Sequence, residues 1–355
     1  MFSLRRCHLK FVKINLLCLI LCSLASTAAL AKEKLIFAVD LIRHGDRNPI
    51  IDLPKSPIAW PGGLGELTAL GMRQEFELGV KLHKRYIEDE KLLPPQYQAE
   101  NIYVRSTDMD RTLVSAESVL MGLYPLGTGP KISGTDKPGL PSAFQPIPIH
   151  TNEKKFDELL WVAPVGIFSK MKFAWEVRQS WREKTKGREQ ELKAWSESTG
   201  IKIDDFLQLD KVADNLYIRR IKHLPLPTGM TPEQELSLLQ LGRWAFITAF
   251  NLPEMYYPMG HHFLNRVGEY FTEASKKKTP LKYVLFSAHD VSIMSVMNML
   301  KSPLSDSPPY ASDLNFSLYE EDGKYFVRVK LNDRPVKVPG CQDTRCTLKE
   351  FSRKW

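Results

Sequence analysis

The chain has 355 residues, of which 43% are hydrophobic and 25% are charged, and its formal net charge is +8. Four basic residues and no acidic ones precede residue 32, so removing this segment lowers the net charge from +8 to +4. A charge this small argues against a nucleic-acid-binding protein, which needs a concentrated basic patch. The length predicts one large domain or a core with an insertion.

Residues 1–31 have the three-part layout of a secretory signal peptide. A basic opening precedes an apolar run from Leu16 to Leu24, and Ala29-Leu30-Ala31 is typical of a cleavage site. The apolar run is shorter than the ~20 residues that a membrane-spanning helix needs, so a membrane anchor is the weaker alternative. We therefore expect an exported protein, periplasmic or secreted, whose mature form has no membrane span.

The mature chain begins with an apolar run, residues 35–42, that predicts a strand buried on both faces. Runs of the same kind at 101–104 and 283–286 predict two more strands. Helical patterns follow each strand, at 68–86, 111–120 and 291–301. This alternation is typical of an α/β fold with a mostly parallel central sheet flanked by helices. Ligands bind at the carboxyl ends of such strands, so the polar segments that follow the strands should meet in one site.

Suitable N-cap residues precede two of these helical patterns. Thr68 comes directly before the first pattern, and Ser106, Thr107 and Asp108 come before the second. Their side-chain oxygens can each accept a hydrogen bond from the backbone of the first helical turn. These residues are therefore the expected helix starts.

Residues 151–276 differ from the rest because they are rich in Trp, Leu, Lys and Glu at helical spacing. We interpret them as a helical cap inserted into an α/β catalytic core made of residues 32–150 and 277–355. The tryptophans of the cap are expected in its own core, with one or two lining a cleft. These residues are Trp161, Trp175, Trp181, Trp195 and Trp244.

The C-terminal part predicts a hairpin and a disulfide. Residues 315–319 and 325–331 have strand character and flank Asp322-Gly323, a hairpin turn signal. Cys341 and Cys346 are the only cysteines after residue 31, and in an oxidising compartment such a pair predicts one disulfide bond. A zinc site is the weaker alternative, because it needs four ligands and no other Cys or His lies near the pair.

The segment Arg43-His44-Gly45-Asp46-Arg47 carries the strongest chemical signal. Two arginines in this spacing can hold a phosphate, and their charges keep the neighbouring imidazole neutral. A neutral imidazole is a nucleophile. Gly45 would let the backbone approach a ligand closely. The alternative is a solvated loop in which Asp46 pairs with Arg47.

Two later segments supply what cleavage of a phosphate ester still needs. Arg105 follows the second strand and adds positive charge beside a predicted helix N-terminus, which favours anions. His289 and Asp290 follow the third strand, and Asp290 can give a proton to the leaving oxygen. Neither segment alone is strong evidence for catalysis. An ion pair explains Arg105 equally well, and a structural hydrogen bond explains His289 and Asp290 equally well.

Together these segments resemble the signatures of the histidine acid phosphatases, branch 2 of the histidine phosphatase superfamily. Residues 43–49 resemble the R-H-G-x-R-x-P signature, and residues 287–290 resemble the distal H-D signature. Residues 105–112 resemble the R-S-T-D-x-D-R-T segment of the prostatic and lysosomal branch. The resemblance spans essentially the whole mature chain. It implies a phosphoglycerate mutase-like core with a helical cap, and we expect a bacterial, secreted acid phosphatase.

The resemblance also implies a role for each site residue. His44 attacks phosphorus, and Asp290 protonates the departing alcohol. The phosphate oxygens are bound by Arg43, Arg47, Arg105 and His289. No metal or other cofactor is needed. An acidic working range is expected, since the proton on Asp290 is scarce at neutral pH unless bound phosphate raises the pKa of this carboxyl group.

The expected substrates are small-molecule phosphate monoesters. Phosphotyrosine, lipid phosphates, nucleotides and sugar phosphates all stay open, as does the oligomeric state, a homodimer included. The phytase branch has T-N after the H-D signature, whereas Val291-Ser292 follows it here, which argues against specialisation for phytate.

Three other functions are weaker alternatives. A metal-dependent phosphoesterase needs D-x-H and G-N-H-[DE] signatures and more ligands than can be assembled here. A periplasmic protein that only binds phosphate esters would use the arginines but would need neither a nucleophile nor a proton donor. A phosphoglycerate mutase of the same superfamily would not carry a signal peptide.

Overall fold

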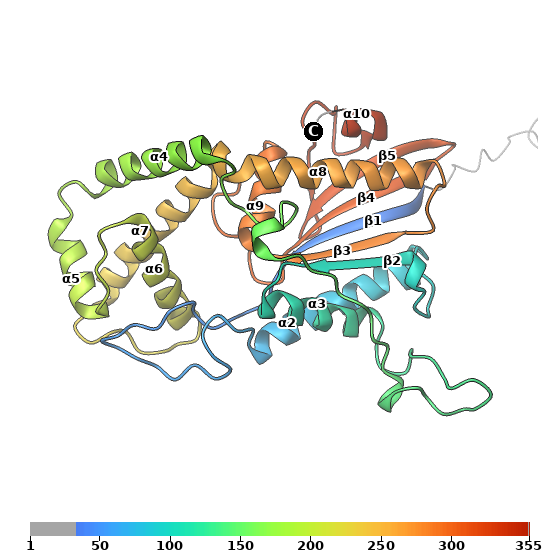
Figure 1. Ribbon diagram of the computed structural model, residues 1–355, viewed down its shortest axis with the longest axis horizontal. Helices are drawn as coiled ribbons and strands as arrows, with labels where there is room; N and C mark the ends of the chain where they lie inside the picture. Colours follow the sequence, from blue (N-terminus) through green and yellow to red (C-terminus); the bar gives the residue numbers. More distant parts are fainter. Residues whose placement is uncertain (1–32, 354) are drawn as a thin grey trace, which may run out of the picture.

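The computed structural model describes residues 33–353 and residue 355. The predicted signal peptide, residues 1–31, lies outside this part of the chain. Within it, no helix is both long enough and apolar enough to span a membrane. A central sheet has helices on both faces, and a group of further helices lies beyond one end of the sheet (Figure 1).

The sheet has seven strands, in the order β2-β3-β1-β4-β5-β6, with β7 also paired to β5. The strands are β1 (Lys34–Arg43), β2 (Ile102–Ser106), β3 (Tyr283–Ala288), β4 (Asp313–Glu321), β5 (Lys324–Leu331), β6 (Arg334–Val336) and β7 (Cys346–Thr347). The α/β class is confirmed, but the sheet is mixed rather than mostly parallel. Only β2, β3 and β1 run parallel, whereas β4 to β7 pair antiparallel. The predicted hairpin at Asp322-Gly323 joins β4 to β5, and so short a connection permits only antiparallel pairing.

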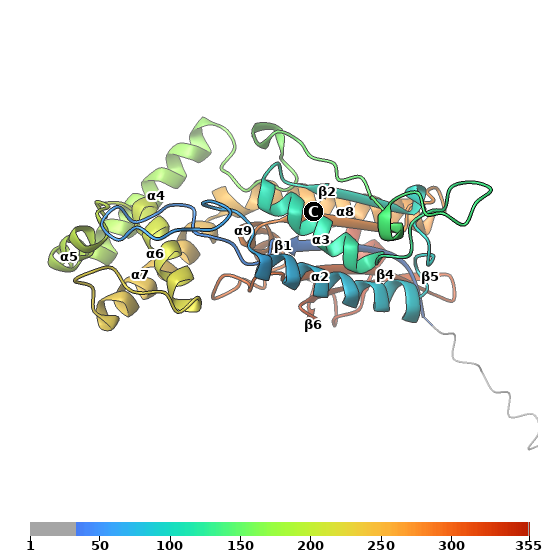
Figure 2. The same ribbon diagram turned by 90° about the horizontal axis from the view of Figure 1, so that it is seen from below.

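Helices cover both faces of the sheet (Figures 1 and 2). One face is covered by α2 (Ala69–His83) and α3 (Asp110–Leu123), and the other by α8 (Pro253–Ser275), α9 (Asp290–Met299) and α10 (Leu348–Ser352). Side chains of β1 alternate between the two hydrophobic cores, as expected for a strand buried on both faces. Phe37, Val39 and Leu41 join the α8 side, whereas Ala38 and Ile42 join the α2 side.

The remaining long helices form a lobe beyond the carboxyl ends of the parallel strands (Figure 1). They are α4 (Ile167–Thr185), α5 (Glu189–Thr199), α6 (Phe206–Ile221) and α7 (Pro232–Phe250). Shorter helical turns are η1 (Lys84–Asp89), η2 (Ala99–Asn101), η3 (Pro141–Ala143) and η4 (Lys154–Phe156). The lobe has its own core, in which Trp181 and Trp195 are buried, but Trp175 is 63% exposed, contrary to expectation. Helix α8, although within residues 151–276, packs on the sheet.

One of the two predicted helix starts is confirmed and the other is wrong. Thr68 is the N-cap of α2, and its hydroxyl accepts a hydrogen bond from the backbone N–H of Gly71. Helix α3 instead begins after Met109, whose side chain makes no cap, so the prediction of a Ser106, Thr107 or Asp108 cap was wrong. The Thr107 hydroxyl lies within hydrogen-bonding distance of His289 instead, because the strand continues to Ser106 and carries Thr107 to the strand end.

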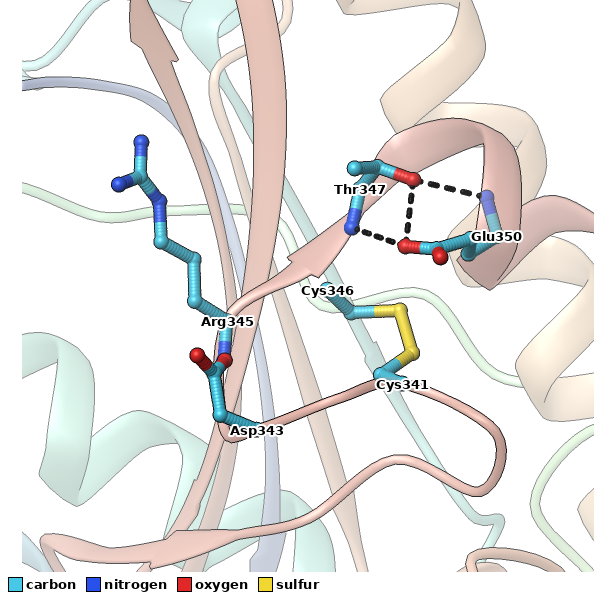
Figure 3. The surroundings of a disulfide bond; sticks show 6 residues. All are labelled: Cys341, Asp343, Arg345, Cys346, Thr347 and Glu350. Carbon is cyan, nitrogen blue, oxygen red and sulfur yellow. Dashed lines mark hydrogen bonds between the residues drawn. A yellow bond between two sulfur atoms is a disulfide. The ribbon is translucent and has the colours of Figure 1, made fainter.

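Cys341 and Cys346 form a disulfide bond, with their Cα atoms 5.3 Å apart (Figure 3). Cys346 lies in β7, so the bond connects the preceding loop to the short strand that pairs with β5. Together with Glu350 they are the one group of three potential metal ligands in the described part of the chain. The bond consumes both thiols, and Glu350 caps α10 by accepting hydrogen bonds from Thr347.

Three carboxyl groups, two of them buried and one half-buried, contribute stability that is lost as the pH rises. Glu75 of α2 is fully buried, and neither of its carboxyl oxygens has a hydrogen-bond partner. Burial raises the pKa of Glu75 well above its usual value, although Arg43 opposes this effect. Burial raises the pKa of Asp40 and Asp313 as well. A carboxyl group with a raised folded-state pKa holds a proton that the unfolded chain has lost, so stability falls as pH rises from about 4 towards that pKa.

The Glu75→Gln substitution should therefore raise the melting temperature at pH 8 and leave it nearly unchanged at pH 4. The reason is that glutamine resembles the protonated carboxyl group but never has to ionise. Thermal unfolding followed by circular dichroism at both pH values measures this. Glu77→Gln, a neighbouring position on the same helix, is the control. A melting temperature lowered equally at both pH values would contradict a protonated Glu75.

Candidate active site

The carboxyl ends of the three parallel strands meet, as the sequence predicted. Arg43 at the end of β1 is paired in register with Ala288 at the end of β3. The N–H of His44 donates to the carbonyl of Ala288 at 3.1 Å, and the N–H of Thr107 donates to that of Ser287 at 3.0 Å. The segments 43–47 and 287–290, at least 240 residues apart in sequence, therefore form one site.

The loop after β1 is buried, so a solvated charged loop is the wrong interpretation. Arg43, His44 and Arg47 are 7%, 2% and 9% exposed. Asp46 pairs with Lys222 and accepts a hydrogen bond from Thr68, rather than pairing with Arg47. The loop is thus held between the start of α2 and the helical lobe.

Gly45 is required for the packing of α2 against the loop. A Cβ atom at Gly45 would lie 2.4 Å from the carbonyl oxygen of Gly71, and one at Gly71 would lie 2.2 Å from that of Asp46. Cβ atoms essentially never lie so close to a non-bonded atom, so both glycines are required for α2 to contact the loop. This contact fixes the backbone on which His44 stands.

His44 has the protonation state of a nucleophile. Its Nδ1 lies 2.9 Å from the carbonyl oxygen of Gly45. A carbonyl can only accept, so Nδ1 carries the proton and Nε2 keeps its lone pair. Burial, together with the charges of Arg43, His289 and Arg47, lowers the pKa of His44 well below its usual value, so the ring is neutral.

Asp290 begins α9 beside the arginines. Its Oδ2 lies 2.9 Å from a guanidinium nitrogen of Arg43 and accepts a hydrogen bond from Ser307, while its Oδ1 accepts one from Val291. Burial opposes ionisation of Asp290, but Arg43 and Arg47 outweigh burial and lower the pKa of the carboxyl group. Asp290 is therefore a carboxylate as long as Arg43 is its partner.

A chain of hydroxyl groups orients His289. Its Nε2 lies 3.0 Å from Thr107 Oγ1, which in turn lies 2.8 Å from Thr112 Oγ1. Thr112 can donate to the carbonyls of Thr107 and Met109, so the direction of donation runs from His289 outwards. Burial, and next the charge of Arg111, lowers the pKa of His289 to about 3. The ring of Trp161 packs edge-on against it, with centroids 5.7 Å apart.

The two arginines of the loop hold carboxylates. Arg43 pairs with Asp290, and its guanidinium lies 4.2 Å from the ring centroid of Tyr310. Arg47 makes two hydrogen bonds to Asp214 of the lobe helix α6, at 2.8 and 3.0 Å. The guanidinium groups of Arg43 and Arg47 therefore both bind carboxylate oxygens, which are oxyanions like those of a phosphate.

Comparison with known proteins assigns the family. The family model described as "Histidine phosphatase superfamily (branch 2)" matches residues 34–332. The chain belongs to this superfamily. Branch 2 contains the histidine acid phosphatases, and these enzymes are metal-independent phosphomonoesterases.

Relatives within the histidine acid phosphatases cover nearly the whole chain. Prostatic acid phosphatase of Bos taurus is 31% identical over 336 residues, which is 90% of this chain and 84% of that protein. Lysosomal acid phosphatase of Xenopus laevis is 32% identical over 359 residues, or 96% and 80% of the two chains. The structure of Klebsiella sp ASR1 phytase has the same fold at 17% identity, with a TM-score of 0.64 over 91% of this chain and 96% of that one.

Arg105 precedes the last residue of β2 and is engaged by a carboxylate. Its guanidinium pairs with the buried Asp157 at 2.5 Å. It also lines a hollow of about 250 Å³ together with residues of α8, among them His262 and Arg266. The alternation of side chains along β2 explains this, because Arg105 shares the α8 face of the sheet with Tyr103, whereas Val104 points to the α2 face.

Arg111 adds positive charge near the two histidines. It lies in the first turn of α3, and its charge lowers the pKa of both His44 and His289. In the described part of the chain no carboxylate lies within ion-pair distance of it, and its Nε is buried without a partner. Burial and the nearby Arg47 lower the pKa of Arg111 to about 10. A guanidinium in this state is suited to an incoming anion.

Sequence reasoning also missed Asp214 and Tyr310, which complete the surroundings of Arg47 and Arg43. Both come from segments with no motif and reach the site only through tertiary packing. Arg111 did carry a signal, since it stands within the recognised 105–112 segment and at the start of a helix, where anions are favoured.

Proposed function

We propose that this protein is an exported acid phosphatase that hydrolyses phosphate monoesters through a phosphohistidine intermediate on His44. One observation above all supports this function. A buried, neutral histidine with a free Nε2 lies among the charges of Arg43, Arg47 and Arg111, and a carboxyl group at Asp290 is beside them. A protein that only binds phosphate would need neither the nucleophile nor the acid.

In the first step the arginines neutralise the phosphate oxygens, and His44 attacks phosphorus. A bond forms between Nε2 and phosphorus while the bond from phosphorus to the ester oxygen breaks. The proton of Asp290 goes to that oxygen, so the product leaves as a neutral alcohol. Most of the catalytic effect in such a transfer comes from charge neutralisation and positioning.

In the second step the carboxylate of Asp290 takes a proton from water. The water oxygen bonds to phosphorus, the phosphorus–nitrogen bond breaks, and the electron pair returns to Nε2 of His44. Inorganic phosphate is released and both residues regain their starting states. No metal ion takes part in either step.

Arg43 connects substrate binding to the acidity of Asp290. While Arg43 pairs with Asp290, the carboxyl group is ionised. A phosphate that draws Arg43 away removes the largest of the charges that lower the pKa of Asp290, and the negative charge of the phosphate acts in the same direction. Both raise the pKa of Asp290, so the proton donor forms once substrate is bound. Protonation of Asp290 still becomes more complete as the pH falls, so activity is expected to be highest on the acidic side.

The direct test is hydrolysis of p-nitrophenyl phosphate by the mature protein from pH 4 to 9 with excess EDTA. Activity on the acidic side that survives EDTA is expected. Loss of activity to EDTA would favour a metal-dependent phosphoesterase, and an alkaline optimum would contradict the role given to Asp290. The absence of turnover at every pH would favour a binding protein.

Asp290→Asn should reduce kcat/KM for β-glycerophosphate about 10²–10⁴-fold and that for p-nitrophenyl phosphate about tenfold or less, because nitrophenolate leaves without a proton. The comparison uses kcat/KM because it contains no step after departure of the alcohol. Asp306→Asn, on the exposed surface, is the control. Equal losses on the two substrates would count against Asp290 as the proton donor.

The finer features of the enzyme are also proposals. We infer export from the predicted signal peptide and the disulfide bond, and a bacterial source and a periplasmic or secreted location remain predictions. Residues 151–276 are proposed to form the cap domain, of which α4 to α7 contribute the lobe. Small phosphate monoesters are the proposed substrates.

A further inference from the structure

The loop between α9 and β4, residues 300–312, places a hydroxyl group between two charged side chains of the site. Ser307 Oγ lies 3.1 Å from a guanidinium nitrogen of Arg43 and 3.1 Å from Oδ2 of Asp290. Arg43 and Asp290 are themselves paired at 2.9 Å, so the three side chains form a closed triangle. Ser307 lies outside the signature segments described above, so the resemblance gives it no role.

The direction of the hydrogen bonds in this triangle follows from the chemistry of its three groups. A guanidinium group can only donate, and an ionised carboxylate can only accept. Ser307 therefore accepts from Arg43 and gives its single hydroxyl proton to Asp290. A hydrogen bond to the charged form of an acid favours that form, so this hydroxyl group makes Asp290 a stronger acid.

Contacts on both sides of Ser307 hold the loop in place. On one side, Arg243 of α7 donates to the carbonyl of Ser305 at 2.9 and 3.2 Å. On the other side, the N–H of Ala311 donates to the carbonyl of His44 at 3.3 Å. Two consecutive prolines follow Ser307 and restrict the backbone between these contacts. The hydroxyl group is thus presented by a loop that is anchored to the lobe and to the nucleophile segment.

We propose that Ser307 is a positioning residue that makes Asp290 a stronger proton donor through the hydrogen bond to its Oδ2. This role rests on the proposed phosphatase function. When a bound phosphate draws Arg43 towards itself, Ser307 stays beside Oδ2. It then supports the carboxylate that forms as the proton moves from Asp290 to the leaving alcohol. Without the hydroxyl group, Asp290 would keep its proton up to a higher pH but would give it up less readily.

Ser307→Ala should therefore change the pH dependence of kcat/KM for β-glycerophosphate in two ways. The alkaline limb should move upward by about one pH unit, the effect of losing one hydrogen bond to a charged group. The acidic plateau should fall about threefold, because a weaker acid transfers its proton more slowly. Ser307→Thr, which keeps the hydroxyl group, should restore both features. A loss by the same factor at every pH would mean a merely structural role and would overturn the proposal.

The other charged and titratable groups that act on Asp290 are the same in the enzyme and in this variant. They are Arg43, Arg47, Arg111, His289 and Asp210. Burial raises the pKa of Asp210 to about 7, so this group titrates within the measured range and the test depends on the difference between variant and wild type. p-Nitrophenyl phosphate is the second substrate. Its acidic plateau should change less than about twofold, because nitrophenolate leaves without a proton.

Ser305→Ala is the matched control, since Ser305 stands in the same loop and contacts Arg243 through its backbone carbonyl. Its pH profile should equal that of the wild type. In an Asp290→Asn background, Ser307→Ala should change kcat/KM less than about twofold, because the acid on which Ser307 acts is gone. A further loss there, with weaker inhibition by inorganic phosphate, would assign Ser307 to Arg43 and overturn the proposal.

Failure of this proposal is distinguishable from failure of the proposed function. A wild-type protein that is inactive at every pH would contradict the phosphatase function itself. An active enzyme whose pH profile is unchanged in Ser307→Ala would contradict only the role of Ser307.

Discussion

Replacing His44 with alanine is expected to reduce turnover of p-nitrophenyl phosphate at least about 10³-fold, as removal of a covalent nucleophile does in other hydrolases. No other side chain can take over. His289 is the nearest ring, with its centroid 5.6 Å from that of His44, but its Nε2 is engaged by Thr107. Binding of phosphate should be largely kept, because the three guanidinium groups remain.

The covalent intermediate gives a second measurement for this prediction. Wild-type enzyme mixed with ³²P-labelled substrate and quenched in alkali should carry label on histidine, and His44→Ala should carry none. His83→Ala is the control, because His83 lies about 20 Å along α2 from the residues that contact the loop. Label that persists in His44→Ala would place the nucleophile elsewhere, and full activity without label in the wild type would favour direct attack by water.

The sequence predicted the sheet edge that carries the candidate site, because the apolar runs of its strands are easy to recognise. The nearly continuous apolar runs of β1 and β3 identify strands buried on both faces, and parallel strands bring their carboxyl ends together. That was enough to expect the 43–47 and 287–290 segments in one place. The hairpin at Asp322-Gly323 followed from turn chemistry in the same way.

Features that depend on three-dimensional packing were not predictable. The hairpin already implied that β4 and β5 pair antiparallel, but nothing in the sequence of β4 encodes its antiparallel pairing with β1. Asp214 reaches Arg47 only because the lobe folds back over the sheet edge, a contact across 167 residues. The burial of Gly45 against Gly71 likewise arises from the approach of α2 rather than from any local pattern.

The choice between Arg105 and Arg111 as phosphate ligand has the largest consequence for the proposed mechanism. Both stand in the same recognised segment, and the resemblance gives the phosphate-binding role to Arg105. A one-residue error in the facing of a strand moves a side chain to the other side of the sheet. Arg105 is on the α8 face with Asp157, whereas Arg111 is brought back to the site by the first turn of α3.

Arg111→Ala is therefore expected to lower kcat/KM for p-nitrophenyl phosphate about 10²–10³-fold, the usual effect of removing one group that stabilises transition-state charge. The inhibition constant of inorganic phosphate should rise with it. Arg73→Ala, on the exposed surface of α2, is the matched control. Arg111→Lys should recover only part of the activity, because an ammonium group cannot bind two oxygens side by side as a guanidinium does.

Arg105→Ala should lower the stability of the fold more than its catalytic activity. It leaves the buried carboxylate of Asp157 without its partner, so a marked fall in melting temperature is expected, with a loss of less than about tenfold in kcat/KM for the folded enzyme. Thermal unfolding and steady-state kinetics on the same preparations separate the two effects. If Arg105→Ala instead lost activity a hundredfold while Arg111→Ala stayed active, Arg105 would be the phosphate ligand. The facing of β2 in the active enzyme would then have to differ from the arrangement described above.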